Sequence, residues 1–333
     1  MDTLLVVTEP VVNIRRKPIK AQPAYIHDDL QETQALYNEI LRYKDESNDW
    51  FYVEAVEQKK WGEKGLWQGY PGWVKKESVR FVEKYPEYTC VVRDAVARIS
   101  EHPSMETKTL LIVSIGTRLR VFGMPENGYE PVYLDHGETG WIAASAIEKN
   151  GRIPDTVTLK ENIINTAGLF LDVPYLWGGR SMYMPELLEG KRESGERRAE
   201  SKKFRSLNSE LQTSQGIATG VDCSGLVNLV FRANRIDIPR DACDQWREAE
   251  KIPLENIEPC DLIFLSAEEK PDSITHVMLY AGGEEFIEAA ETGGTVRINT
   301  FREKFGMSRS ELIQNHLAIG SRTMYFGKVT LNR

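Results

Sequence analysis

The most constraining feature of the sequence is a cysteine followed by apolar residues at helical spacing. They stand three, four, seven and eight positions after Cys223: Leu226, Val227, Val230 and Phe231. These offsets define one face of a helix whose first turn holds Cys223. A thiol there meets the positive end of the helix dipole, which favours the nucleophilic thiolate. A buried, inert cysteine is the alternative, because free cysteine is among the most buried residue types.

A nucleophilic cysteine needs a base, and His276 is the candidate among five histidines. It opens the strand-like segment THVMLY, on the face shared with Met278 and Tyr280. The alternative to a catalytic base is a structural histidine held by hydrogen bonds. A carboxylate beside its Nδ1–H would fix the tautomer and stabilise the imidazolium.

Glu288, in the following segment FIEAA, is the candidate carboxylate. A three-residue loop over 281–283 would set Glu288 directly opposite His276. A two-residue turn at Gly282 and Gly283 would instead send Glu288 to the other face of the sheet. Glu288 is then an exposed strand residue, so its assignment depends on the register.

The first 150 residues have the turn and alternation pattern of short strands and contain a weak repeat. Gly72-Trp73-Val74 is echoed 68 residues later by Gly140-Trp141-Ile142. Two small β-barrels, over 1–82 and 83–152, would produce this pattern.

The remaining residues, 153–333, have a different pattern of apolar and polar residues, which predicts an α+β domain. Residues 159–173 have the apolar spacing of a helix, which Pro174 interrupts. Residues 180–218 are strongly polar and charged, which predicts a solvated insertion on the surface.

Composition excludes several classes of protein. The net charge of −8 argues against nucleic acid as a partner. Four scattered cysteines without a CxxC pair argue against zinc and against a disulfide framework. The sequence contains no run of 18 or more apolar residues, so it predicts no membrane span. The opening MDTLLVVTEP lacks the apolar stretch of a secretory signal, which predicts a cytoplasmic protein unless a leader was removed.

Together GVDCSGLV, THVMLY, FIEAA and YLWGG resemble the NlpC/P60 cysteine peptidases. The paired barrels resemble the bacterial SH3-like modules of that family's γ-D-glutamyl-L-diamino acid endopeptidases. The resemblance implies an α+β, papain-like catalytic domain over 153–333, preceded by two SH3-like β-barrels. It covers nearly the whole chain apart from the insertion.

Carried over residue by residue, the resemblance makes Cys223 the nucleophile and His276 the base. The third polar position, most often histidine in the family, falls on Glu288. Tyr175 of YLWGG matches a tyrosine whose hydroxyl helps the Cys223 backbone N–H hold the oxyanion.

The same resemblance implies residues that read the substrate. Glu39, Tyr70 and Asp241 match positions that bind the free α-amine of the peptide. Many relatives carry serine after the aspartate, where this chain has Ala242. The residues that flank the nucleophile are also candidates for substrate binding: Asp222 and Ser224.

The implied reaction is hydrolysis of the γ-D-glutamyl bond to the diamino acid in a short peptide such as L-Ala-γ-D-Glu-diamino acid. Either diaminopimelate or lysine fits, a free N-terminus is expected, and a cytoplasmic location would indicate recycling of wall peptides. No metal or organic cofactor is implied. The rival interpretations are a non-catalytic wall-binding protein and an amidase or acyltransferase on the same scaffold.

Overall fold

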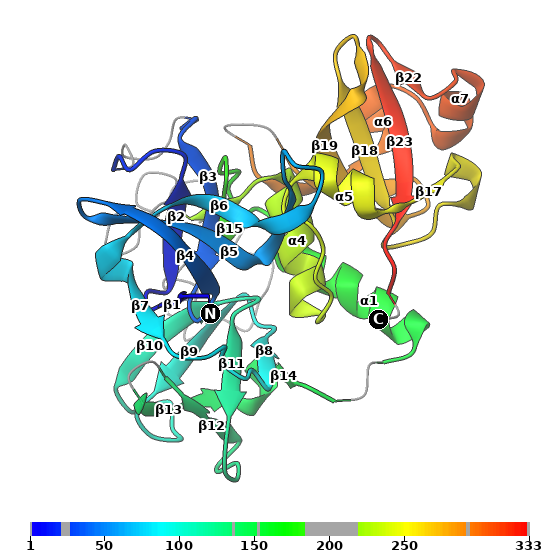
Figure 1. Cartoon of the computed structure of the whole chain (residues 1–333). Coiled ribbons are helices and arrows are strands. Elements are labelled where there is room, and N and C mark those ends of the chain that lie inside the picture. The colour runs from blue at the N-terminus through cyan, green and yellow to red at the C-terminus, as the bar shows by residue number, and fades with distance from the viewer. Residues whose placement is uncertain are drawn as a thin grey trace. The chain divides into compact units, whose positions relative to one another are not determined.

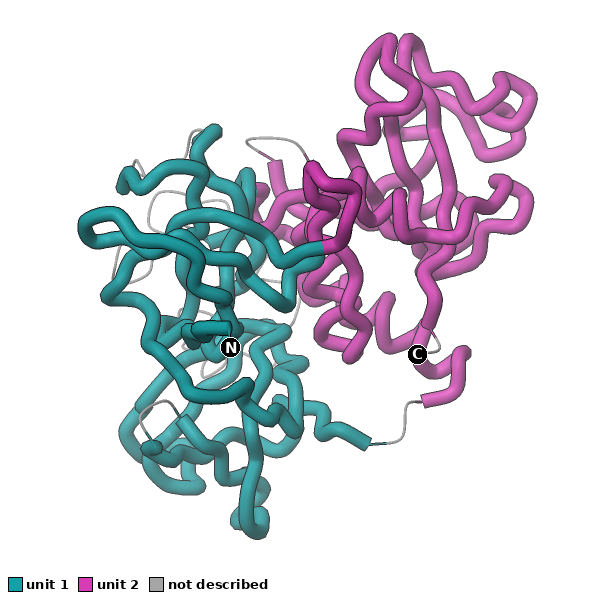
Figure 2. The backbone as a smooth tube through the Cα atoms, viewed as in Figure 1, with its two compact units in different colours: residues 1–59, 68–152, 176–220 teal, residues 60–67, 153–175, 221–333 magenta. Residues whose placement is uncertain are grey.

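The computed structural model describes residues 2–20, 27–134, 137–151, 154–183, 219–290 and 294–331. The chain divides into two compact units (Figure 2). Unit 1 holds residues 1–59, 68–152 and 176–220, and unit 2 holds residues 60–67, 153–175 and 221–333.

Unit 1 begins with a seven-stranded antiparallel sheet whose strand order is β3-β2-β6-β5-β4-β1-β7 (Figure 1). Its strands are β1 (Leu4–Val7), β2 (Val11–Arg15), β3 (Gln31–Leu36), β4 (Ile40–Ser47), β5 (Trp50–Trp61), β6 (Trp67–Lys75) and β7 (Val79–Val82). A 3₁₀ turn, η1 (Lys76–Ser78), separates the last two. Apolar side chains from alternate positions, such as Leu5, Val53 and Val74, form its core.

A second seven-stranded sheet follows, with the order β10-β9-β13-β12-β11-β8-β14. Its strands are β8 (Cys90–Val92), β9 (Val96–Ser100), β10 (Thr109–Ser114), β11 (Arg118–Val121), β12 (Tyr129–Tyr133), β13 (Thr139–Ala143) and β14 (Ile147–Lys149). The 3₁₀ turn η3 (Ala144–Ala146) stands where η1 stands in the first sheet. The two strand orders correspond place by place, so the sequence repeat is a structural repeat.

The repeated Gly-Trp pair shows why these positions match. A Cβ on Gly72 would lie 2.5 Å from Cγ2 of Ile14, and one on Gly140 would lie 2.5 Å from Cγ2 of Ile99. Both glycines are needed because the neighbouring strand approaches too closely for any side chain. The two predicted SH3-like modules are thereby confirmed.

Residues at the start of the predicted solvated insertion are buried, which corrects that part of the prediction. The short strand β15 (Arg180–Ser181) and Met182 are shielded from solvent within unit 1. The Arg180 N–H donates to Oε1 of Gln34 at 3.0 Å, and the Met182 N–H donates to Oγ of Ser114 at 2.9 Å. Polar sequence here marks buried hydrogen bonding; residues 184–218 lie outside the described residues.

Unit 2 is built on a third sheet, with the order β17-β23-β18-β19-β20-β21 and β22 paired to β23. The strands are β17 (Glu250–Ile252), β18 (Leu262–Ala267), β19 (Lys270–Gly282), β20 (Glu285–Ala289), β21 (Val296–Thr300), β22 (Ala318–Ile319) and β23 (Arg322–Lys328). A two-residue strand, β16 (Gly220–Val221), precedes helix α4 (Cys223–Ala233). The predicted α+β class is confirmed.

Helices α1 (Thr156–Gly168), α4 (Cys223–Ala233) and α5 (Ala242–Glu248) belong to unit 2 as well. Helix α1 ends five residues before the predicted end at 173. The N–H groups of Leu169 and Phe170 bond three residues back, which tightens the last turn, and Asp172 has a φ of 68°. Every residue of α4 is buried, so α4 packs all round and not only along its predicted stripe.

The core beneath one face of the sheet contains Met278 and Tyr280 of β19 and Phe286 of β20. Two short helices, α6 (Phe301–Phe305) and α7 (Arg309–Gln314), add Phe301 and Leu312 to this core. Each begins with a capping box, in which the N-cap side chain and a glutamate three residues later satisfy each other's backbone N–H groups. The 3₁₀ turn η4 (Leu254–Asn256) adds Leu254.

Candidate active site

Cys223 is the first residue of α4, which places it in the first turn as the apolar spacing predicts. The preceding Asp222 is the N-cap, and its Oδ1 accepts the N–H of Gly225 at 2.6 Å. The cap ends the extended segment β16 and starts the helix at the cysteine. The Cys223 thiol is therefore held at the positive end of an 11-residue helix dipole.

A buried arginine fixes this helix start from the side. Arg240 donates to both carboxylate oxygens of Asp222, at 2.9 and 2.7 Å, and to Oγ of Ser224 at 2.9 Å. A bidentate pair with an additional hydrogen bond restricts orientation more than a point contact does. Asp222 and Ser224, predicted as substrate-binding residues, use these oxygens to hold the nucleophile's own turn. Sequence reasoning missed Arg240, because nothing in the sequence pairs it with a cap 18 residues away.

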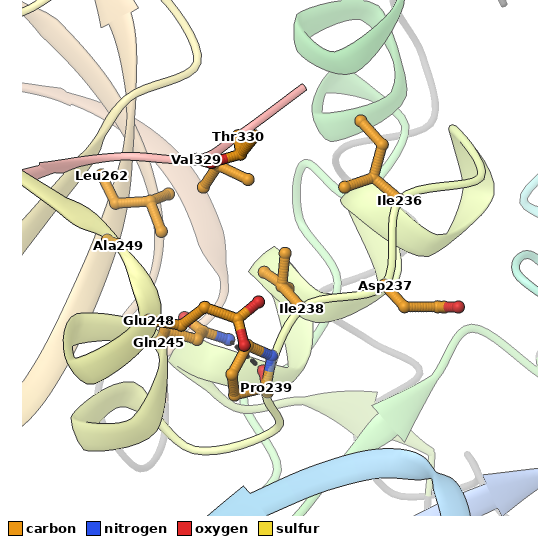
Figure 3. A pocket seen from close by; sticks show the side chains of 10 residues that line it. All are labelled: Ile236, Asp237, Ile238, Pro239, Gln245, Glu248, Ala249, Leu262, Val329 and Thr330. Atoms are coloured by element: carbon orange, nitrogen blue, oxygen red, sulfur yellow. Dashed lines mark hydrogen bonds between the residues drawn. The ribbon is translucent and has the colours of Figure 1, made fainter. Parts of the chain in front are cut away.

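Gln245 of α5 supports the same turn on its carbonyl side. Its Nε2 donates to the carbonyl of Ser224 at 3.0 Å and to that of Pro239 at 3.0 Å. Gln245 also lines a small cavity together with Ile238 and Pro239 (Figure 3). At about 20 Å³ this cavity has room for roughly one water molecule, so it is too small to be a substrate site.

His276 lies on β19, opposite Leu265 of β18. Its Nε2 lies 3.0 Å from Oε2 of Glu288 on β20, and its side chain also hydrogen bonds to Cys223. The structure thus joins Cys223, His276 and Glu288 in one line of contacts. The prediction had the carboxylate at Nδ1, and this is wrong: Glu288 bonds Nε2, which leaves Nδ1 for the thiol.

Neither predicted hairpin register is correct, although Glu288 does lie on the face of His276. Tyr280 pairs with Phe286 and Gly282 pairs with Glu285, with an irregularity between the two pairs. This register sets Glu288 opposite Met278, one place along the same face from His276. The bulge restores the alternation that a simple turn at Gly282 and Gly283 would have reversed.

The electrostatics at His276 favour its charged form. Burial opposes the charge, but the Cys223 thiolate and the hydrogen bond to Glu288 outweigh burial and raise the pKa of His276 to about 9. At neutral pH the imidazolium can therefore stabilise a thiolate beside it and serve as a proton donor.

Glu288 is fully buried and surrounded by donors. Burial alone would raise the pKa of its carboxyl, but the hydrogen bonds from His276 and Lys304 hold that pKa far below its usual range. Asn299 Nδ2 also donates to Oε1 at 2.9 Å. Glu288 is thus an ionised hydrogen-bond acceptor at neutral pH.

Tyr175 is brought next to the nucleophile's segment. It forms a parallel bridge with Val221, two residues before Cys223, and its N–H donates to the carbonyl of Gly294 at 2.8 Å. This placement agrees with the predicted neighbourhood. The contribution of its hydroxyl to an oxyanion site stays a prediction.

Asp241 is held inside unit 2 by the segment 60–67. Its Oδ2 forms an ion pair with Lys60, and the neighbouring Asp244 accepts the N–H of Trp61 at 2.9 Å. Arg247 covers the Trp61 ring at 5.0 Å. Asp241 therefore already has a cationic partner, and its role in binding an amine stays a prediction.

The two remaining predicted substrate residues belong to unit 1. Glu39 is buried, and Arg180 and Gln58 donate to its two carboxylate oxygens. The Tyr70 hydroxyl donates to Oε2 of Glu32 at 3.3 Å. Their roles in binding substrate stay predictions.

Within the described ranges, no group of three or more histidine, cysteine, aspartate or glutamate side chains is arranged to hold a metal ion. In the same ranges no helix is long and apolar enough to cross a membrane.

Comparison with known proteins agrees with this geometry. Residues 172–312 match the NlpC/P60 family. The chain is 27% identical to the γ-D-glutamyl-L-lysine dipeptidyl-peptidase of Bacillus subtilis over 280 residues, which cover 83% of this chain and 78% of that protein. It is 25% identical to the enzyme of the same name from Bacillus cereus, over 80% of this chain and 69% of that one.

The fold has a counterpart among solved structures. The crystal structure of an NlpC/P60 family protein from Bacillus cereus superimposes with a TM-score of 0.69, over 90% of this chain and 94% of that one, at 22% identity. At this identity the likeness establishes the fold alone. The fold and the Cys–His–Glu line define a papain-like cysteine peptidase. More narrowly, residues 172–312 of the chain match the NlpC/P60 family.

Proposed function

We propose that the protein hydrolyses the γ-D-glutamyl bond to the diamino acid in short cell-wall peptides that carry a free N-terminal L-Ala. The observation that carries this proposal is the hydrogen-bonded line from Cys223 through His276 to Glu288 at the start of a buried helix. The names of the relatives support the choice of bond. A cytoplasmic site of action, in the recycling of wall peptides, completes the proposal.

In the proposed reaction the Cys223 thiolate attacks the γ-carbonyl of D-glutamate. The backbone N–H of Cys223 and the Tyr175 hydroxyl stabilise the oxyanion. The C–N bond then breaks as His276 gives its proton to the leaving amine, which yields a thioester and the free diamino acid. Water, deprotonated by His276, cleaves the thioester and restores the thiol. Glu288 orients the imidazole throughout.

Glu39, Tyr70 and Asp241 form the proposed recognition set for the free α-amine. The assignment rests on the resemblance of these positions to family residues that bind the amine, and the structure pairs Glu39 with Arg180 and Asp241 with Lys60. An ammonium group must therefore share or replace these cations in order to bind. An acetylated N-terminus carries no charge and fits this set poorly.

The test is incubation of the purified protein with L-Ala-γ-D-Glu-diaminopimelate and its lysine analogue, each beside its N-acetylated twin. Release of the diamino acid from the free peptides alone, and its loss in Cys223→Ala, is the expected result. Equal cleavage of the acetylated peptides would remove the roles of Glu39, Tyr70 and Asp241. Absence of any cleavage by a folded protein would overturn the proposed substrate and favour an amidase or acyltransferase.

A further inference from the structure

Lys304 of α6 contacts the same carboxylate oxygen that holds the histidine. Its Nζ forms an ion pair with Oε2 of Glu288, and His276 Nε2 lies 3.0 Å from that oxygen. The other oxygen, Oε1, accepts from Asn299 at 2.9 Å and from Arg297 at 3.4 Å, both on β21. One oxygen of the buried carboxylate therefore contacts the titratable His276 together with Lys304. The other oxygen contacts Asn299 and Arg297.

The position of Lys304 is built into the fold. The capping box of Thr300 and Glu303 starts α6 directly after β21. Phe301 packs on Phe286 of β20 with ring centroids 5.4 Å apart, and Phe305 stacks on the same ring at 5.8 Å. In the sequence, Lys304 lies between Phe301 and Phe305 of α6. Glu288 lies two residues after Phe286 on β20. The helix therefore presents its lysine to this carboxylate by packing.

The charge of Glu288 acts differently on the two steps of a peptidase reaction. A carboxylate alone beside the imidazole would favour the imidazolium and make it a weak acid. The imidazolium must nevertheless release its proton to the leaving amine. It is then neutral, and the charge of the buried Glu288 is balanced by Lys304 at Oε2 and by Arg297 at Oε1, 3.4 Å away. A permanent cation on the oxygen that contacts His276 acts on both steps.

We propose that Lys304 is a positioning residue of this peptidase: by sharing Oε2 of Glu288 with His276, it limits how firmly that carboxylate holds the proton on the imidazole. The inference rests on the proposed roles of Cys223 and His276. The charged and titratable groups around the pair are Cys223 of α4, Arg297 of β21 and Lys304 itself. Burial and the charge of Lys304 lower the pKa of His276, whereas Cys223 and Glu288 raise it.

The experiment compares Lys304→Gln with Lys304→Arg, which keeps the charge. Arg302→Gln is the matched control, because Arg302 lies on the same helix and pairs with Glu311, away from Glu288. Two quantities are measured for each: the pKa of His276 by NMR, assigned through its loss in His276→Gln, and the pH dependence of peptide cleavage. The NMR titration does not depend on the substrate, so it separates failure of this inference from failure of the proposed function.

In Lys304→Gln we expect the pKa of His276 and the upper pH limit of cleavage to rise by about one unit. The turnover rate at neutral pH should fall about tenfold, because the imidazolium is a weaker acid. Lys304→Arg and Arg302→Gln should remain close to the unaltered protein. A His276 titration unchanged in Lys304→Gln, with only thermal stability reduced, would overturn the inference.

A second pair of variants covers the case in which Lys304→Gln does not fold. Glu288→Gln and the double variant Glu288→Gln/Lys304→Gln leave no buried carboxylate without a cation. The pKa of His276 should be higher in the double variant than in Glu288→Gln, because a neighbouring positive charge has been removed. Equal values would contradict a role for Lys304 at the histidine.

Discussion

The two reactive groups of the site are each held by a buried carboxylate, but in different ways. On the nucleophile's side, Asp222 is paired with Arg240, whose charge is permanent. On the base's side, Glu288 is paired with His276, whose charge changes during the reaction. The first pair fixes the backbone of a helix start, and the second sets the proton on a side chain. The Asp222–Arg240 pair therefore contributes mainly to stability, and the Glu288–His276 pair contributes mainly to the chemistry.

The largest expected effect separates chemistry from folding. Cys223→Ala and His276→Ala should each lower the cleavage rate by at least about 10⁴-fold, because nucleophile and base act as a unit. The free energy of unfolding should fall by no more than about 3 kcal/mol, the usual upper range for a single substitution. Kinetics and urea unfolding on the same samples check this. Residual cleavage within tenfold of the unaltered protein would contradict the assignment.

Loss of Arg240 should act on stability first. Arg240→Met leaves the buried Asp222 carboxylate without its partner, so we expect the free energy of unfolding to fall by about 3–5 kcal/mol. Arg302→Gln, which breaks an exposed ion pair, should cost under about 1 kcal/mol. Urea unfolding measures both. Equal losses in the two variants would remove the distinction drawn for the helix start.

Loss of Glu288 should act mainly on the pKa of His276. Glu288→Gln removes the anion that raises the pKa of His276, so that pKa should fall from about 9 and the upper pH limit of cleavage should fall with it. We expect a loss of roughly 10- to 100-fold in rate at pH 8, within the range of general acid–base catalysis. The pH profile is the measurement. An upper limit that stays at pH 9 would show that Glu288 does not control the base.

The smallest expected effect is a contribution of His276 to the free energy of unfolding that depends on pH. Because the folded protein raises the pKa of His276 above its ordinary 6.5, the charged imidazole stabilises the fold below that value. This contribution should disappear as the pH rises from 6.5 through about 9. The difference in unfolding free energy between the unaltered protein and His276→Gln should shrink over the same window. A difference that grows with pH would have the wrong sign.

Much of the site follows from local sequence. The stripe after Cys223 predicted helix α4 with Cys223 in its first turn, and one of the two hairpin registers considered put His276 and Glu288 on one face. The register did not follow, because the irregularity between Tyr280 and Gly282 has no marker in the sequence. Such bulges depend on how the whole sheet packs.

The supporting side chains could not be predicted for a different reason. Arg240, Lys304 and Arg180 reach their carboxylates from elements 18, 16 and 141 residues away. A buried charge and a solvated one look alike in a sequence until the partner is placed. The charged composition of 180–218 therefore concealed a buried arginine at its first position.

The central claim is that His276 activates Cys223, and competition among the cysteines tests it most directly. Cys243 is the exposed thiol, but burial of its sulfur and the neighbouring Asp244 raise its pKa to about 11. The protein is treated with limiting iodoacetamide at pH 7, and labelling at each cysteine is followed by peptide mass spectrometry beside the loss of cleavage. The account predicts that Cys223 is labelled first, in step with inactivation, and that His276→Ala abolishes this preference. Labelling of Cys243 ahead of Cys223, or complete labelling of Cys223 with cleavage intact, would contradict it.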